Sequence, residues 1–300
     1  MITEIKIEKK TKSVLNDVST LVFDLKDKHL AVVYGDWQKK EELINSIKLL
    51  KEMVEFGRDE DVSVDYCRGQ RYSFMFDVPY IGKVEYQFSV EVGSVTEEML
   101  AYKLNSRRVV VFSKKKDGSV NLHRELFKNE KCRKIIDVEL MKNRLSILKL
   151  CKNVFEFYLW KHSNLEEKLD KLLYYIESIK VPTVSEMLDV RNSKKSEIAA
   201  IEDFMPFCYE VAVVDGIDGI INPLLLKEVL TKAQEEKLLT GQLILFYNSL
   251  ELMEMPDARN FVFFIGADGV KCVKDYERRT FKNNNVRCRY LAGDYGALPK

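Results

Sequence analysis

The alternation of apolar and polar residues predicts strands in the first part of the chain. Residues 2–8 alternate with a period of two, which is typical of an edge strand. Two further strands are expected at residues 20–25 and 30–34, joined by a polar turn. Residues 41–56 place their apolar side chains at helical spacing. The pattern therefore predicts a turn that starts at Gly35 and a helix that starts at Glu41.

The middle of the chain changes from strands to helices. Residues 72–78, 84–90, 99–104 and 109–112 alternate, and Asp117-Gly118 is a hairpin turn signal, so this part is expected to be mainly antiparallel. Residues 127–179 carry leucines at helical spacing. The aromatic residues Phe155, Phe157, Tyr158 and Trp160 are interpreted as core, and Glu97-Glu98 as a solvated helix face.

The last part of the chain has the rhythm of an α/β fold. A polar turn leads into a helix that stops before Pro206, and an apolar strand at residues 211–214 follows. A helix at residues 224–237 and strands at residues 242–246, 261–265 and 270–273 complete the pattern. Strands separated by helices favour a mostly parallel sheet.

Composition is that of an ordinary folded protein of 300 residues, with 46% hydrophobic and 32% charged residues. A formal net charge of +1 argues against a generally basic protein that coats nucleic acid. No apolar run reaches the roughly 18 residues of a membrane span, so no membrane association and a cytoplasmic location are expected. Six scattered cysteines and three histidines give no zinc motif, and reduced thiols are expected.

The order strand, Gly-led turn, helix at Gly35 is the context of a phosphate-binding P-loop. Of the consensus GxxxxGK[ST], Gly35 remains, and Lys39 and Lys40 are followed by two glutamates instead of a hydroxyl residue. An ordinary strand–turn–helix with charged capping is the alternative for this segment. Asp215 ends a buried strand, where P-loop nucleotidases place a Mg²⁺ ligand. An Asp-Gly turn explains it equally well.

The densest basic stretch lies near the end of the chain and includes Arg287 and Arg289. A solvated face is one interpretation of these arginines. Contact with nucleic-acid phosphates, or with an acidic partner surface, is the other.

Four stretches carry a family likeness: Val32-Val-Tyr-Gly, the block around Val84-Glu-Tyr-Gln-Phe, Val213-Val-Asp-Gly-Ile-Asp-Gly-Ile-Ile-Asn-Pro, and Arg289-Tyr-Leu-Ala-Gly-Asp-Tyr-Gly-Ala-Leu-Pro. With these, the chain resembles the ABC-type AAA ATPases of prokaryotic defence loci, relatives of the OLD and SMC ATPase heads. The resemblance implies an α/β, P-loop-NTPase-like ABC ATPase head with an antiparallel β lobe and a helical insertion. It implies a single domain, residues 1–300, with sub-parts 1–126, 127–182 and 183–300.

The sequence departs from that family at the positions of its catalytic motifs. The second glycine and the Ser/Thr of the phosphate loop are missing, and Gly216 replaces the catalytic glutamate after Asp215. Asn222 stands where the family has a histidine, and another expected histidine falls near Asn248 or Ser249. The signature segment is Asn192-Ser-Lys-Lys-Ser, without its glycine.

Five departures together imply a pseudo-ATPase that acts as a structural or regulatory subunit and needs no cofactor. A role in phage defence or a mobile-element module is what the resemblance suggests. The partner would be another protein, or a second copy through the ATPase-head surface. One alternative is a divergent ATPase that binds Mg-ATP through Gly35, Lys39, Lys40 and the metal ligand Asp215. Another is a nucleic-acid-binding accessory protein that uses Arg287 and Arg289.

Overall fold

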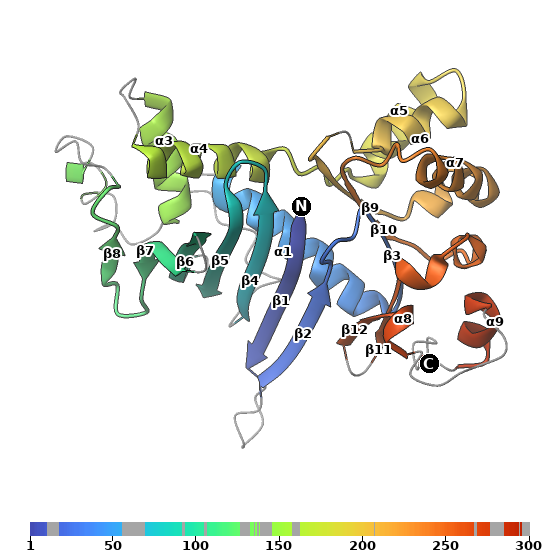
Figure 1. Ribbon diagram of the computed structural model, residues 1–300, viewed down its shortest axis with the longest axis horizontal. Helices are drawn as coiled ribbons and strands as arrows, with labels where there is room; N and C mark the ends of the chain where they lie inside the picture. The colour runs from blue at the N-terminus through green and yellow to red at the C-terminus, as the bar shows by residue number, and fades with distance from the viewer. Residues whose placement is uncertain are drawn as a thin grey trace. The chain divides into compact units, whose positions relative to one another are not determined.

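The protein is a mixed α/β protein, shown as a computed structural model in Figure 1. The structure describes residues 1–10, 18–55, 70–91, 94–104, 107–126, 133–134, 136, 138, 146–157, 163–206, 208–266, 269–276, 285–293 and 295. The chain forms two compact units. Unit 1 contains Met1, Phe23–Ile44 and Ile179–Lys300, and unit 2 contains Ile2–Val22 and Asn45–Ser178.

Unit 1 is built on a five-stranded sheet with the order β12-β11-β3-β10-β9. Its strands are β3 (Leu30–Gly35), β9 (Val211–Asp215), β10 (Gln242–Phe246), β11 (Val262–Gly266) and β12 (Gly269–Cys272). The first four are mutually parallel, as predicted for the strands of the last part of the chain, and β12 pairs with β11 in the antiparallel sense. Because the four strands are parallel, their carboxyl ends share one edge of the sheet.

Alternate residues of these strands face one large core. Leu30, Val32 and Tyr34 of β3 belong to it. The core also holds apolar residues of the other parallel strands and of the helices that follow them. The strands are buried on both faces, which explains why their sequences read as continuous apolar runs instead of alternating ones.

The helices of unit 1 include three that the sequence pattern did not predict. They are α5 (Val184–Ser193), α6 (Glu197–Phe204), α7 (Pro223–Glu235), α8 (Val273–Tyr276) and α9 (Val286–Leu291), with 3₁₀ helices η2 (Ile217–Gly219), η3 (Glu251–Glu254) and η4 (Ala258–Asn260). The unpredicted helices are α5, α8 and α9, and in α5 Met187 is the buried residue. A single buried position leaves no apolar stripe to detect. The start of α5 is set by Thr183, which forms a capping box with Glu186.

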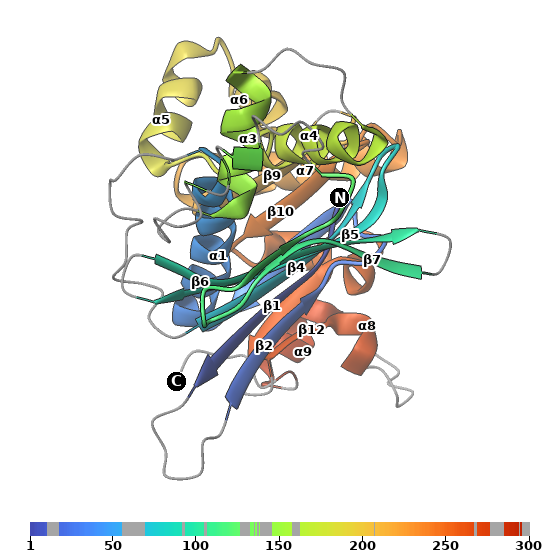
Figure 2. The same ribbon diagram turned by 90° about the vertical axis from the view of Figure 1, so that its left-hand side faces the viewer.

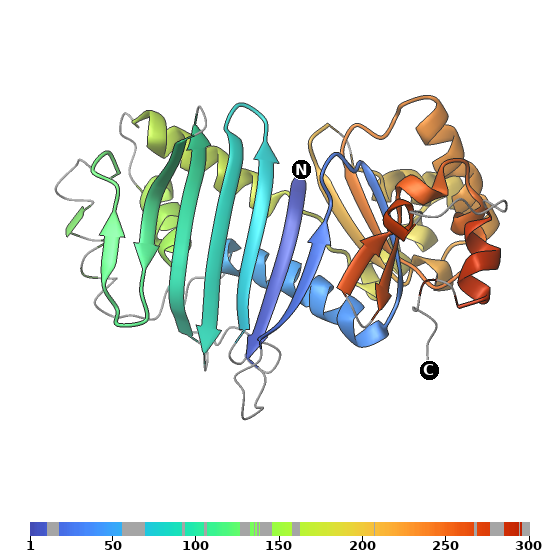
Figure 3. The same cartoon turned by 60° about the horizontal axis from the view of Figure 1, so that its bottom comes forward.

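Unit 2 is built on a seven-stranded sheet with the order β2-β1-β4-β5-β6-β7-β8. Its strands are β1 (Ile2–Lys10), β2 (Val18–Asp24), β4 (Gln70–Val78), β5 (Gly82–Glu91), β6 (Ser94–Leu104), β7 (Arg107–Lys114) and β8 (Val120–Leu122). Figure 3 shows them in this order, from blue β1 and β2 to green β8. The pairings from β1 to β8 are antiparallel, as predicted.

The prediction that residues 2–8 form an edge strand is wrong, because β1 lies between β2 and β4. Period-two alternation reports that one face of a strand is polar, and it says nothing about a free edge. Residues 1–126, grouped by sequence as one β-rich sub-part, supply strands to both units, since β3 belongs to unit 1.

Helices α3 (Ile147–Phe157) and α4 (Asn164–Glu177) lie on the same side of the unit 2 sheet (Figure 2). The interpretation of Glu97-Glu98 as a solvated helix face is wrong. Both residues lie in β6, and alternation along this strand turns Glu98 inward, where it is 2% exposed. Tyr158 and Trp160 of the predicted aromatic core lie outside the described residues, as does the side chain of Phe157.

No helix in the ranges that the structure describes combines the length and apolar character needed to cross a bilayer.

Candidate functional site

The turn expected to hold phosphate is almost absent. Gly35 is the last residue of β3, and helix α1 (Trp37–Glu55) begins two residues later, so only Asp36 lies between strand and helix. The predicted helix start at Glu41 is therefore wrong. The reason is a cap: Asp36 Oδ1 accepts a hydrogen bond from the Lys39 N–H at 3.1 Å, which allows the helix to start at Trp37.

The backbone of this turn contacts the neighbouring strand β11. Gly35 has a φ of 114°, and a Cβ on this residue would lie 2.4 Å from the carbonyl oxygen of Ile265. The Asp36 N–H donates to the same oxygen at 3.3 Å. A P-loop binds phosphate with a series of N–H groups that point into an open nest. Here the first N–H after the strand is directed at protein, and the next residues are already helical.

The two lysines of the first turn of α1 donate to carbonyl groups at the sheet edge. Lys40 Nζ donates to the Tyr247 carbonyl oxygen and to Asn248 Oδ1, both at 2.8 Å. Lys39 Nζ donates to the Gly266 carbonyl oxygen at 2.6 Å. The Lys40 side chain is 6% exposed. Burial lowers the pKa of Lys40, while the charges of Asp215 and Asp218 act in the opposite direction.

The loop after β9 reaches the same place. Asp215 is the exposed last residue of β9 and lies beside Phe246 of β10 in register. Gly216, with a φ of 71°, turns the chain into η2. Asp218 Oδ2 then accepts the N–H groups of Asn248 at 3.1 Å and Ser249 at 3.0 Å. Lys40, Asp215, Asp218 and Asn248 thus meet at the carboxyl ends of β9 and β10.

This group of residues does not fit Mg-ATP. Lys40 is directed at the backbone of residue 247, and Asp36 alone between β3 and α1 is too short a connection to form a cradle. Nor do the described residues contain three or more His, Cys, Asp or Glu side chains placed to hold a metal ion. The arrangement is a set of internal hydrogen bonds that connects the start of α1, the segment after β9 and the segment after β10.

Two other positions that depart from the family pattern act as helix caps. Asn222 Oδ1 accepts the Leu224 N–H at 3.0 Å at the start of α7, which has Pro223 at its first position. The segment 192–196 ends α5, and its Ser196 accepts the Ala199 N–H at 3.2 Å to begin α6.

The two arginines suggested for nucleic-acid contact have partners within unit 1. Arg287 forms an ion pair with Glu254 at 2.6 Å. The Arg289 guanidinium lies over the ring of Tyr295, with 5.2 Å between its carbon and the ring centroid. A role in nucleic-acid binding stays a prediction without structural support.

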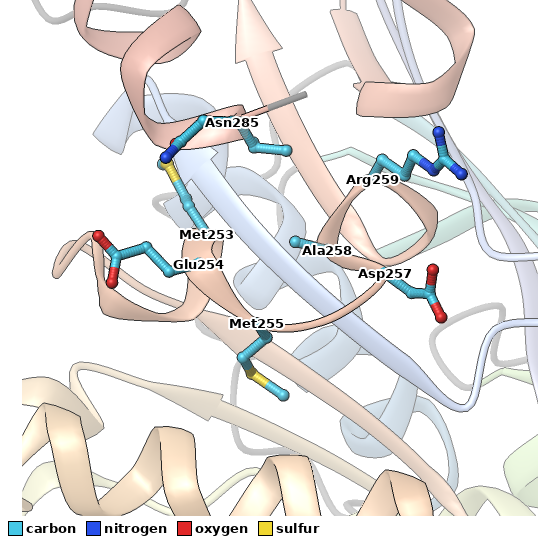
Figure 4. Close-up of a pocket in the computed structure, with 8 residues that line it drawn as sticks. Met253, Glu254, Met255, Asp257, Ala258, Arg259 and Asn285 are labelled. Atoms are coloured by element: carbon cyan, nitrogen blue, oxygen red, sulfur yellow. The ribbon is translucent and has the colours of Figure 1, made fainter. Parts of the chain in front are cut away.

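A pocket of about 380 Å³ lies elsewhere in unit 1 (Figure 4). Residues of η3, η4 and the start of α9 line it, and those with buried side chains are Met253, Met255, Ala258 and Val286. The charged ends of Glu254, Asp257 and Arg259 point outward from its centre. None of Gly35, Lys39, Lys40 and Asp215 lines this pocket.

The early start of α1 has one signal in the sequence. Asp36 stands three residues before Lys39, and aspartate is a strong N-cap residue, so a cap at this position is a legitimate prediction. Nothing in the local sequence indicates which groups accept hydrogen bonds from Lys39 and Lys40. Tyr247 is 207 residues away from Lys40 in the chain.

Comparison with protein-family models gave no match, and comparison with curated protein sequences gave none either. Among solved structures, the chain is similar to the SMC head domain from Thermotoga maritima, with a TM-score of 0.35 and 13% identity. The similarity covers 90% of this chain and 97% of that domain. With this TM-score the similarity carries no conclusion about activity or partners.

Proposed function

We propose that this protein is a catalytically degenerate, ATPase-head-like protein that acts as a structural or regulatory subunit. The observation that carries the proposal is the single residue between β3 and α1. A nucleotide-binding loop of the P-loop type needs several residues there. A role in phage defence or a mobile element stays a prediction from the resemblance, to be tested by plating phage on cells with and without the gene.

The strand order supports the head-like part of the proposal. In open α/β sheets, ligands bind outside the carboxyl ends of the strands, near the point where the order reverses. The chain goes from β3 to β9, returns to β10 between them, and then crosses to β11 on the other side of β3. The residues expected to carry chemistry lie at that edge, but Lys39 and Lys40 donate to carbonyl groups of the protein itself.

The chemistry supports the degenerate part. Phosphoryl transfer depends on positioning and on neutralisation of charge. Losing one such electrostatic contact costs about 100-fold in rate or more, and here the cradle, the metal-binding hydroxyl and the water-orienting glutamate are all replaced. In the divergent-ATPase alternative, Lys40 would have to leave the Tyr247 carbonyl oxygen, which is costly because a buried acceptor would lose its donor.

Lys40→Met tests this proposal. We expect no ATP turnover above background for the wild type, Lys40→Met or Asp215→Ala. We also expect Lys40→Met to lower the free energy of unfolding by about 2 kcal/mol, because a buried carbonyl is left without its charged donor. The matched variant is Lys39→Met. The Lys39 side chain is more exposed than that of Lys40 and donates to the Gly266 carbonyl oxygen, so this variant should lose under about 1 kcal/mol. Steady turnover that disappears in Asp215→Ala would overturn the proposal.

The surface at this edge favours a protein partner over a nucleotide. Residues 35–42 and 215–218 carry two lysines against five carboxylates. Both lysines bond to carbonyl groups, and Trp37 beside them is 68% exposed. Phosphates would be repelled here, and a homodimer through this edge would bring like charges together. We therefore propose a partner segment that carries positive charge and apolar residues, since an exposed indole binds both.

A peptide probe tests that partner chemistry. A short helical peptide of lysine and leucine should quench or shift Trp37 fluorescence in a Trp160→Phe background, which leaves Trp37 as the single tryptophan. Asp36→Lys with Glu41→Lys should weaken this binding about tenfold, roughly 1.4 kcal/mol. Glu235→Lys with Glu236→Lys, at the exposed far end of α7, is the control. Equal binding of a glutamate–leucine peptide, or equal effects of the two variants, would contradict the proposed partner.

A further inference from the structure

Beneath the carboxyl edge of the unit 1 sheet, three buried oxygen atoms have no hydrogen-bond partner in the described part of the chain. They are Tyr34 Oη, Tyr247 Oη and Glu251 Oε2. Tyr34 is 1% exposed and Tyr247 is 0% exposed. Buried polar atoms are nearly always paired with protein or with ordered water, because an unpaired one loses its hydration without compensation.

These atoms belong to one neighbourhood. Tyr34 is next to last in β3, and Tyr247 directly follows β10, the neighbouring strand. Their rings meet edge to face, with centroids 6.1 Å apart and an interplanar angle of 84°. Glu251 begins η3, four residues after Tyr247, and its charge acts on both phenols.

The two phenols stay protonated and can act as hydrogen-bond donors. Burial raises the pKa of Tyr34 and of Tyr247, and the charges of Asp218 and Glu251 raise both further, so each hydroxyl keeps its proton. Ser249 acts in the opposite direction on the pKa of Tyr247, but the Tyr247 hydroxyl has no hydrogen-bond partner among the described residues. The two hydroxyl donors and Glu251 Oε2 thus belong to one neighbourhood and make no direct hydrogen bonds to one another.

We propose that an ordered water molecule is bound between Tyr34, Tyr247 and Glu251, as an internal site that holds η3 against the sheet. A water molecule accepts from the two hydroxyls and donates to Glu251 Oε2, so it satisfies all three atoms. A metal cation fits less well, because it would leave both hydroxyl protons without an acceptor. Asp218, whose charge also acts on both phenols, accepts two backbone N–H groups through Oδ2 and interacts with Lys40.

Helix η3 connects this water site to the pocket of unit 1. Glu254, at the end of η3, pairs with Lys227 of α7 at 3.0 Å and with Arg287 of α9 at 2.6 Å. Met253 and Glu254 line the pocket shown in Figure 4. The bound water fixes the start of the same short helix, so its loss should loosen the η3 wall of that pocket.

Tyr34→Phe tests the inference, because the substitution removes the hydroxyl and keeps the ring. If water bridges the three atoms, the melting temperature should fall by roughly 2–4 °C, and amide exchange of residues 251–254 should become about fivefold faster. Tyr247→Phe should do the same, and the double variant should lose less than the sum because both hydroxyls share one ligand. An unchanged or raised melting temperature in Tyr34→Phe would overturn the inference.

Two controls distinguish this water site from a general effect of losing a buried hydroxyl and from a bound cation. Tyr102→Phe removes a buried hydroxyl of unit 2 that also has no partner among the described residues, and it should not speed exchange at residues 251–254. Wild-type melting should be the same in potassium, sodium and choline chloride at one ionic strength. Stabilisation by one alkali cation that Tyr34→Phe abolishes would overturn the water assignment in favour of a cation.

Discussion

Gly35→Ala is expected to lower the free energy of unfolding of unit 1 by about 3–5 kcal/mol. Two costs add. A φ of 114° is disfavoured for alanine, and the new Cβ would lie 2.4 Å from the Ile265 carbonyl oxygen. That oxygen is backbone of the adjacent strand and accepts the Asp36 N–H, so it cannot move aside without cost. Urea unfolding, with hydrogen exchange of β3 and β11 to locate the loss, measures it.

Gly216→Ala is the matched control for this prediction. Gly216 also has a positive φ, of 71°, but a Cβ there would meet nothing within 4 Å. Only the backbone cost applies, so a loss of about 1–2 kcal/mol is expected. Equal losses in the two variants would show that Ile265 gives way, and the close approach of β3 and β11 would then not require glycine.

Gly35 can be required for packing instead of for phosphate binding. In a P-loop, glycine allows N–H groups to surround phosphate. In this protein, Gly35 lets the end of β3 pass close to the carbonyl oxygen of Ile265. The same residue at the same place in a strand–turn–helix therefore has a packing role that needs no ligand.

The strands were predictable where one physical rule decided them. Strands separated by helices in the last part of the chain, together with the apolar run at β9, predicted a mostly parallel sheet, and alternation predicted the antiparallel sheet of unit 2. The helix start at Trp37 was missed because the apolar face of α1 begins further along at Leu43, while the deciding signal was the Asp36 cap. Helix α5 was missed because it buries little.

The sequence predicted where the candidate site residues lie, but it did not predict their hydrogen-bond partners. Topology brings the ends of β3 and β9 to one edge, so residues chosen there from sequence, Lys40 and Asp215, do approach each other. Whether Lys40 faces a ligand or a carbonyl group depends on Tyr247 and Asn248. These residues are far from Lys40 in sequence, and no local pattern specifies how their side chains and backbone are oriented.

Glu98 was misassigned for a similar reason, and it gives the second large prediction. Glu98 joins β6 to the start of α3: its Oε2 accepts the Ile147 N–H at 2.6 Å, and its Oε1 accepts the Leu148 N–H at 3.1 Å. Oε1 also accepts the Tyr86 hydroxyl at 2.9 Å. One buried carboxylate thus satisfies N–H groups that every helix leaves open at its N-terminus.

Glu98→Ala should lower the free energy of unfolding of unit 2 by about 3–5 kcal/mol, because it leaves buried donors unpaired and opens a cavity. Glu98→Gln keeps an oxygen acceptor and nearly the same volume, so it should lose under about 2 kcal/mol at neutral pH. Urea unfolding with hydrogen exchange of α3 measures both. Equal losses in the two variants would mean that the negative charge, and not the acceptor oxygens, holds α3 to β6.

The pH dependence of the stability difference between the wild type and Glu98→Gln separates the effect of the Glu98 charge from that of its hydrogen bonds. Burial raises the pKa of Glu98 above its ordinary value of 4.5, although the bonds from Ile147, Leu148 and Tyr86 and the charge of Lys114 oppose this. The native state then keeps its proton at pH values where the unfolded chain has lost it. Wild-type stability relative to Glu98→Gln should therefore be greatest below pH 4.5 and should fall as the pH rises through the native pKa. A difference that grows with pH would show that hydrogen bonds to the charged form outweigh the cost of burying it.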